Sequence, residues 1–183
     1  MRALVLGDSH LARPVRAGWT ISPEATSVAV GGAVATDLPG QVAGLDPSAY
    51  DVVVVSIGTN DAGWRDVPLA EFTDALGWLL GWAGGTPVLL MTSPGCDEAS
   101  AAGHWSNTRL REYADAASAL VETAGGQVFD TPAVLAPLGP AAFVEDGFHL
   151  TPAAYDLLLP ALRRAADAAR PGAETAPVRR LPG

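Results

Sequence analysis

The segment 51–57, Asp-Val-Val-Val-Val-Ser-Ile, constrains the possible folds more than any other stretch of the chain. Its middle is β-branched, and its apolar residues do not alternate with polar ones. A strand with one solvent-facing side would alternate, whereas a parallel strand covered on both faces forms a continuous apolar run. The segment therefore predicts a central strand of a parallel sheet with structure packed on both sides.

The rest of the chain alternates between strand and helix patterns. Apolar runs predict further strands over 3–6, 27–30, 87–91 and 127–130. Helical spacing of apolar residues predicts helices over 68–82, 107–123 and 152–170. Prolines and glycines indicate a brief helix after residue 9, an interrupted helical pattern over 33–42, and loops over 92–103 and 131–148. Strands and helices in alternation predict an α/β fold with a doubly wound parallel sheet.

Polar residues follow several of the predicted strands. Ser9 stands after the first strand in Gly7-Asp8-Ser9-His10, Gly32 after the second, and Asn60 after the central one in Gly58-Thr59-Asn60-Asp61. A late loop adds Asp146-Gly147-Phe148-His149. Ligands of open parallel sheets bind outside the carboxyl ends of the strands, so we expect these groups to converge there. A hydroxyl, an amide, an imidazole and a carboxylate at one edge predict a catalytic site.

The composition predicts one compact globular domain. With 183 residues, of which 49% are hydrophobic, the chain is long enough for a sizeable core and too apolar for disorder. We expect the domain to span 1–170 and the Pro-rich segment 171–183 to form a flexible tail.

The charge balance indicates a small-molecule partner. All eleven basic residues are arginine and the formal net charge is -9, so the chain offers no basic face to nucleic acid or to an anionic membrane. Cys96 is a single cysteine and cannot form an internal disulfide, and the first residues lack a signal-peptide pattern. No apolar run approaches the roughly 18 residues of a membrane span. These features predict a cytoplasmic protein and leave its oligomeric state open.

The blocks around Ser9, Gly32, Asn60 and His149 resemble, in order and rough spacing, those of the SGNH hydrolases, also called the GDSL esterase/lipase superfamily. The resemblance covers nearly the whole chain. It implies a flavodoxin-like three-layer α/β/α sandwich around a five-stranded parallel sheet. It also implies hydrolysis or transfer of acyl groups from esters and thioesters, with no cofactor.

Carried over residue by residue, the resemblance implies Ser9 as nucleophile, His149 as base and Asp146 as the acid that orients it. Ser9, Gly32 and Asn60 would donate hydrogen bonds in the oxyanion hole. The chain departs from the family pattern at His10, where leucine is usual. We interpret His10 as a variation outside the chemistry.

The chemistry of ester cleavage asks for the same residue types. A serine hydroxyl is a weak nucleophile until a base takes its proton, and an Asp three residues before a His can turn back to hold the imidazole Nδ1–H. A tetrahedral intermediate needs preorganised donors, which an unhindered glycine N–H and a side-chain amide supply. Each residue alone also has an ordinary reading, such as a turn serine or an Asx turn. We expect Asp8 and Asp61 to support the site by bonding backbone N–H groups.

Two alternatives use other chemistry. Asp8-x-His10 and Asn60-Asp61 superficially resemble parts of the ligand sets of calcineurin-like phosphoesterases, but the chain has only three histidines, so we expect no metal. A non-catalytic flavodoxin-like binding module would not need the Asp146–His149 pair, and no Gly-rich phosphate loop favours it. The favoured function is cleavage of an acyl ester, of the carboxylester or deacetylase type, through an acyl-enzyme. Acyl transfer and thioester hydrolysis by the same triad stay open.

The sequence does not determine the acyl group or the alcohol. The loops that would form the pocket, 61–67, 94–106 and 131–145, have the least regular patterns. Trp64 and Trp105 follow strand ends and are candidates to line the pocket. His104 and Cys96 are expected in its wall or at the surface.

Overall fold

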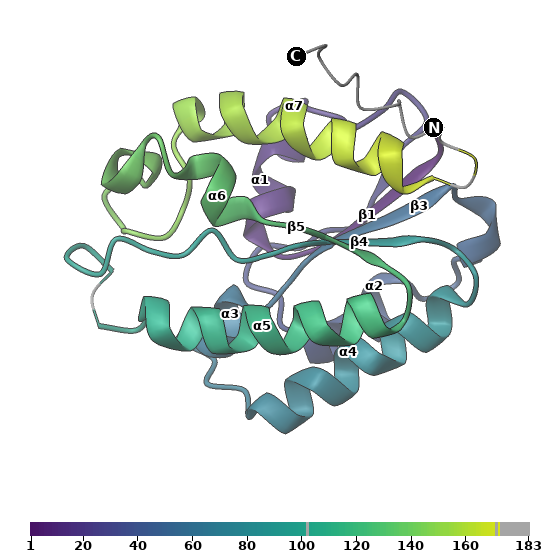
Figure 1. Ribbon diagram of the computed structural model, residues 1–183, viewed down its shortest axis with the longest axis horizontal. Coiled ribbons are helices and arrows are strands. Elements are labelled where there is room, and N and C mark those ends of the chain that lie inside the picture. Colours follow the sequence, from purple (N-terminus) through teal and green to yellow (C-terminus); the bar gives the residue numbers. More distant parts are fainter. Residues whose placement is uncertain (102, 171, 173–183) are drawn as a thin grey trace, which may run out of the picture.

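The protein is described by a computed structural model that places residues 1–101, 103–170 and 172 (Figure 1). Apart from Gly172, the tail predicted over 171–183 lies outside the described residues. One parallel sheet has the order β2-β1-β3-β4-β5. Its strands are β1 (Ala3–Gly7), β2 (Thr26–Ser27), β3 (Val52–Ser56), β4 (Val88–Met91) and β5 (Gln127–Phe129). The predicted α/β fold with a five-stranded parallel sheet is confirmed, and the strand order is the flavodoxin-like one.

The segment predicted to be central is central. β3 lies between β1 and β4, and it pairs with β1 from Ala3↔Val52 to Gly7↔Ser56. All five of its residues are buried. Alternate residues of β3 face different cores, with Val53 and Val55 on one side and Val52 and Val54 on the other. A strand buried on both faces explains why the run is apolar without alternation.

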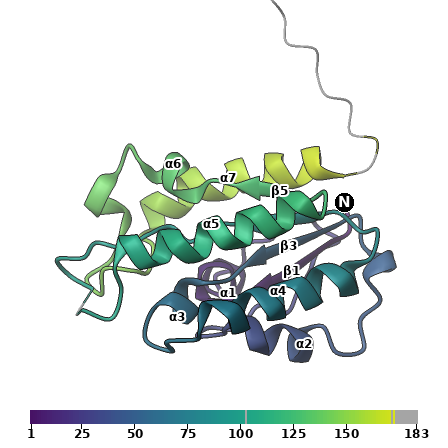
Figure 2. The same cartoon turned by 60° about the horizontal axis from the view of Figure 1, so that its bottom comes forward.

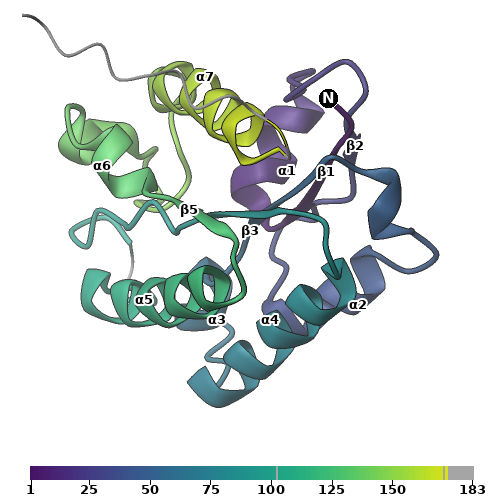
Figure 3. The same cartoon turned by 45° about the vertical axis from the view of Figure 1, so that its right-hand side comes forward.

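Helices form the outer layers of the sandwich (Figures 1 and 3). One face is covered by α2 (Leu38–Gln41), α4 (Leu69–Ala83) and α5 (Asn107–Thr123), and Figure 2 shows α4 and α5 side by side there. The other face is covered by α1 (Ser9–Arg16), α6 (Thr131–Leu135) and α7 (Pro152–Ala169). The chain adds α3 (Thr59–Ala62) and short 3-10 turns at Ala35–Asp37, Pro47–Ala49 and Gly139–Ala142. No helix of the described residues is long and apolar enough to cross a membrane.

Local signals place the helix starts. The Thr151 hydroxyl accepts a hydrogen bond from the Ala154 N–H, so α7 begins where the Thr-Pro pair predicted it. Asp8 caps α1 by accepting from the His10 N–H. Because Ser9 is the first residue of α1, this cap fixes the backbone at the serine.

Two segments differ from their predictions. The segment 131–148 is not one loop, because Asp130 caps α6 through the Ala133 N–H and Pro132 occupies the first turn, where its missing N–H does no harm. The second strand is only two residues long, although Val28 and Val30 still donate backbone hydrogen bonds to β1. β2 is at the exposed edge of the sheet, so packing gives it little support.

Candidate active site

Ser9, His149 and Asp146 form one line of hydrogen bonds at the carboxyl edge of the sheet. Ser9 Oγ lies 3.1 Å from His149 Nε2, and His149 Nδ1 lies 2.7 Å from Asp146 Oδ2. A carboxylate can only accept, so Nδ1 carries the proton and the Nε2 lone pair faces the hydroxyl. The structure thus brings together three residues from opposite ends of the chain in the geometry of a nucleophile, a base and an orienting acid.

The loop that carries His149 is held by its own backbone. Asp146 Oδ1 accepts from the N–H groups of Phe148 and His149 at 3.1 and 2.9 Å. Gly147 has φ +77°, and a Cβ at this position would lie 2.6 Å from the Ala101 nitrogen. The Asp97 N–H donates to the Gly147 carbonyl. Only glycine fits this close approach between the two loops.

Asp146 is kept ionised by these contacts. Burial acts to raise its pKa, but the hydrogen bonds from the His149 N–H, the His149 ring and the Phe148 N–H outweigh burial and lower the pKa below its usual value. A carboxylate beside Nδ1 would stabilise the protonated form of the His149 ring.

The predicted oxyanion donors keep N–H groups that are not used within the described residues. The N–H groups of Ser9 and Gly32 have no hydrogen-bond partner among the described residues. A Cβ on Gly31 would lie 4.0 Å from the Ser9 Cβ, so the Gly31-Gly32 turn passes directly beside the serine. Gly32 has φ +79°, which favours glycine there.

The third donor is the Asn60 amide. Its Nδ2 donates one hydrogen to the Ala33 carbonyl at 2.9 Å, and its Oδ1 accepts from the Trp64 indole at 3.0 Å. These two bonds distinguish the amide nitrogen of Asn60 from its oxygen. They leave the second N–H of Nδ2 free within the described part of the chain. Sequence reasoning missed the Trp64 contact. Its signal was the i, i+4 spacing after Asn60.

Asp8 and Asp61 are buried beneath these donors. Asp8 Oδ1 accepts from the His10 N–H and the Ser56 hydroxyl, and Asp61 Oδ1 accepts from the Ala35 N–H. Burial raises the pKa of Asp8 to about 7 and that of Asp61 to about 6. Asp8 therefore links the first turn of α1 to Ser56 of β3, and Asp61 links α3 to the backbone N–H of Ala35.

An aromatic stack supports the other side of His149. The centroid of the Phe148 ring lies 4.1 Å from that of His149 and 4.1 Å from that of Trp105. Phe148 stacks on Trp105 at an interplanar angle of 20°. The Trp105 indole donates to the Thr59 carbonyl at 2.9 Å. A Cβ on Gly63 would lie 2.0 Å from that indole nitrogen, so Gly63 makes the room for Trp105. The stack joins the His149 loop to the block that carries Asn60, and no periodic sequence pattern predicts it.

His10 lies next to the site without taking part in its hydrogen bonds. The ring is buried, neither nitrogen has a partner among the described residues, and burial lowers its pKa to about 3. Its centroid is 6.3 Å from that of His149. His10 is therefore a neutral packing residue at physiological pH, in the place of the usual leucine.

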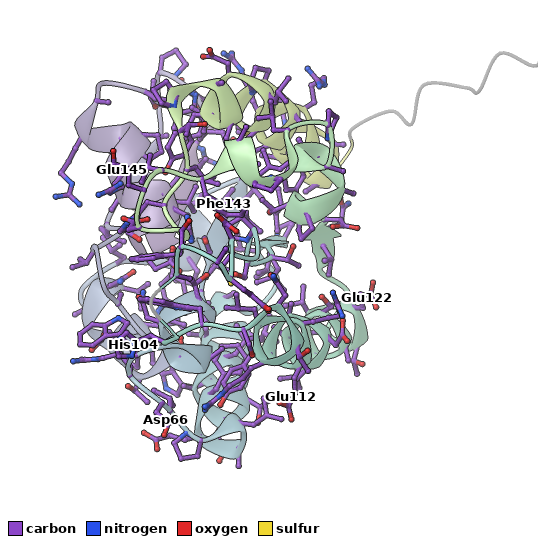
Figure 4. The ribbon with its side chains drawn as sticks, turned by 90° about the vertical axis from the view of Figure 1, so that its left-hand side faces the viewer. Asp66, His104, Glu112, Glu122, Phe143 and Glu145 are labelled. Atoms are coloured by element: carbon purple, nitrogen blue, oxygen red, sulfur yellow. The ribbon has the colours of Figure 1, made fainter. Side chains whose placement is uncertain are left out.

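The two remaining candidates, His104 and Cys96, lie outside the hydrogen-bonded line of Ser9, His149 and Asp146. Figure 4 faces the carboxyl edge and shows His104 below Phe143 and Glu145, which precede the His149 loop. Cys96 is buried, and burial with the nearby Glu98 and Asp97 raises the pKa of its thiol to about 11, so it is not a thiolate nucleophile at neutral pH. Within the described ranges, no three His, Cys, Asp or Glu side chains gather as a metal site.

An α/β sheet that presents Ser9, His149 and Asp146 in hydrogen-bond contact has the architecture of a serine hydrolase. Residues 6–157 match the GDSL-like Lipase/Acylhydrolase family, and the chain belongs to this family. The predicted resemblance is confirmed, and the protein is a serine esterase.

Solved structures share the fold. A lipase/acylhydrolase from Enterococcus faecalis is 24% identical with a TM-score of 0.76, over 90% of this chain and 95% of that one. An acetylxylan esterase from Geobacillus stearothermophilus is 20% identical with a TM-score of 0.66, over 89% and 92% of the two chains. No curated protein matches the chain. At these identities the neighbours show the architecture and do not identify a substrate.

Proposed function

We propose that the protein cleaves a small carboxylic ester through a covalent acyl-enzyme on Ser9, with His149 as base and Asp146 as its orienting acid. The observation that carries this proposal is the hydrogen-bonded line from Ser9 Oγ through His149 to Asp146. Two structures of the Geobacillus esterase, described as catalytic mutants, carry a serine-to-alanine or a histidine-to-alanine substitution. They support a serine and a histidine as the working pair.

In the first half-reaction, Ser9 Oγ attacks the ester carbonyl carbon while its proton moves to His149 Nε2. The carbonyl oxygen becomes an oxyanion and is held by the N–H groups of Ser9 and Gly32 and by Asn60 Nδ2. The bond to the alcohol oxygen then breaks, and this oxygen takes the proton from His149. The alcohol leaves, and the acyl group stays on Ser9.

In the second half-reaction, water gives a proton to His149 and attacks the acyl-enzyme carbonyl. The tetrahedral intermediate collapses to the free acid, and Ser9 regains its proton. An alcohol in place of water would make the same steps an acyl transfer.

The test is turnover of 4-nitrophenyl acetate by the wild type and by Ser9→Ala. We expect Ser9→Ala to lose at least about a thousandfold in kcat, since only the donors and binding remain. Leu157→Ala, on the exposed side of α7, serves as the matched control and should keep full activity. Ser9→Ala activity within threefold of the wild type would refute the proposal. Loss of wild-type activity in EDTA, restored by Mn²⁺ or Zn²⁺, would instead favour the phosphoesterase.

A further inference from the structure

A hollow of about 530 Å³ opens on the Gly32 side of the site. We call it the Gly32 hollow, and its wall includes Val28, Val30, Gly32, Gln41, Trp64 and Arg65. Val30 is 55% exposed and Trp64 is 50% exposed. Two large apolar side chains thus meet solvent in one concave place, which is typical of a ligand-binding surface.

The hollow is continuous with the proposed oxyanion donors. Gly32 belongs to both, and a Cβ on Gly32 would lie 3.9 Å from the Trp64 ring. Trp64 in turn bonds Asn60 Oδ1. A group bound in the hollow therefore lies next to the carbonyl that reacts with Ser9.

Two polar side chains of the wall, Gln41 and Asp37, are hydrogen-bonded within the protein. Gln41 Oε1 accepts from the Gly7 N–H, and Gln41 Nε2 donates to the Gly7 carbonyl. Asp37 Oδ2 accepts from the Val34 N–H. The Arg65 guanidinium lies over the Trp64 ring, 4.9 Å from its centroid. Apart from the Arg65 guanidinium, the surface left for a ligand is mainly valine, tryptophan and glycine, and it favours a hydrocarbon group.

The proton path decides which part of an ester reaches the hollow. His149 Nε2 gives its proton to the leaving oxygen, so the alcohol must lie on the His149 side. The carbonyl oxygen lies toward Gly32 and Asn60. The remaining substituent of the carbonyl carbon is the acyl chain, which is directed away from His149 along the Gly32 turn.

We propose that the Gly32 hollow binds the acyl chain, and that the substrates are esters of short- to medium-chain aliphatic acids. This inference rests on the proposed role of Ser9. Full burial of one methylene strengthens binding about fourfold, and an open hollow should give about twofold per methylene. With a constant leaving group, kcat/KM should therefore rise about 16-fold from acetyl to hexanoyl, because these chains differ by four methylenes.

The experiment compares 4-nitrophenyl esters from acetyl to hexanoyl in the wild type, in Val30→Asp and in Leu157→Asp. Each variant places a carboxylate at an exposed apolar position, but Leu157 lies on α7, across the sheet from the hollow. We expect Val30→Asp to reduce the 16-fold rise to less than about threefold, because a carboxylate in the wall disfavours a hydrocarbon chain. Leu157→Asp should keep the wild-type rise. A second series, acetate esters of alcohols of increasing length, should respond equally in all three proteins.

Three results would overturn the inference. The rise with acyl length could be absent in the wild type, or it could survive in Val30→Asp. Val30→Asp could also change the dependence on alcohol length alone, which would place the alcohol in the hollow. In all three cases an acyl adduct on Ser9 would leave the proposed function standing. Absence of turnover and of adduct with every ester would refute the proposed function, and the inference with it.

Discussion

The two sides of Ser9 differ in how firmly their residues are held. On one side, the His149 loop is fixed by the Asp146 carboxylate, by the close approach of Gly147 to residues 97–101 and by the Trp105–Phe148 stack. On the other side, Gly32 adjoins an open hollow where Val30 and Trp64 are exposed. Proton transfer needs a fixed geometry, whereas a chain that only has to be accommodated tolerates an open wall. Under the proposed function, the chemical steps depend on the fixed His149 side, and selection of the acyl chain depends on the open Gly32 side.

The largest effect is expected on the fixed side, from Asp146→Asn. The amide would offer N–H groups to His149 Nδ1 and favour the wrong tautomer, so kcat should fall by about ten thousandfold. Steady-state kinetics with 4-nitrophenyl acetate measure this, and the circular dichroism spectrum should not change. A loss of less than tenfold would show that the His149 side is not organised by Asp146.

Asn60→Ala tests the donors that separate the two sides. A donor aimed at the oxyanion acts in the transition state, so kcat should fall by about a hundred- to a thousandfold with little change in KM. An effect confined to KM would make Asn60 a substrate-binding residue. The oxyanion donors would then not include Asn60.

Trp105 tests whether the position of His149 depends on the aromatic stack, because Phe148 lies between the two rings. Trp105→Leu removes the stack and should lower kcat about tenfold or more through misplacement of His149, while KM stays within about twofold. Trp105→Phe keeps a ring beside Phe148 and should recover most of the loss. Trp78→Leu, at a 45% exposed position of α4, is the control. Equal losses in the Leu and Phe variants would assign the effect to the Thr59 hydrogen bond instead.

The last prediction concerns the free energy of unfolding rather than the reaction rate. Burial lowers the pKa of His10 from 6.5 to about 3, so below pH 6.5 the unfolded chain binds a proton that the folded protein does not. Stability from this source is present above pH 6.5 and is lost as the pH falls, by about 1.4 kcal/mol per pH unit. His10→Leu removes this loss. In urea unfolding from pH 6.5 to 4.5, the free energy of unfolding of the variant should rise relative to that of the wild type as the pH falls.

The titration of Asp8 does not change the difference in stability between the wild type and the variant. Its pKa is raised to about 7, so its contribution is lost as the pH rises, in the wild type and in the variant alike. A difference between the two proteins that is constant with pH would mean that His10 is not buried in its neutral form.

Local sequence patterns predicted the strands, the helix starts and the polar residues that follow the strands. The valine run placed β3 in the centre, Thr151-Pro152 placed the start of α7, and the polar residues after the strands placed Ser9 and Asn60 at one edge. These patterns did not predict the contacts that depend on loops meeting in space. Trp105 on Phe148 and Gly147 against Ala101 join segments without periodicity, so no sequence pattern predicts these contacts. The same limitation hid α6, where a cap and a proline organise a segment that otherwise reads as a loop.

The central claim is that Ser9 forms an acyl-enzyme, and the most direct measurement is intact mass after a rapid acid quench with 4-nitrophenyl acetate. We expect a mass increase of one acetyl group in the wild type, mapped by peptide mass to the segment that contains Ser9, and no increase in Ser9→Ala. Asp146→Asn should form the adduct far more slowly, since acylation needs His149 in its oriented form. An adduct on Ser56 or Ser93, or a burst of product without any adduct, would contradict the assignment of Ser9 as the nucleophile.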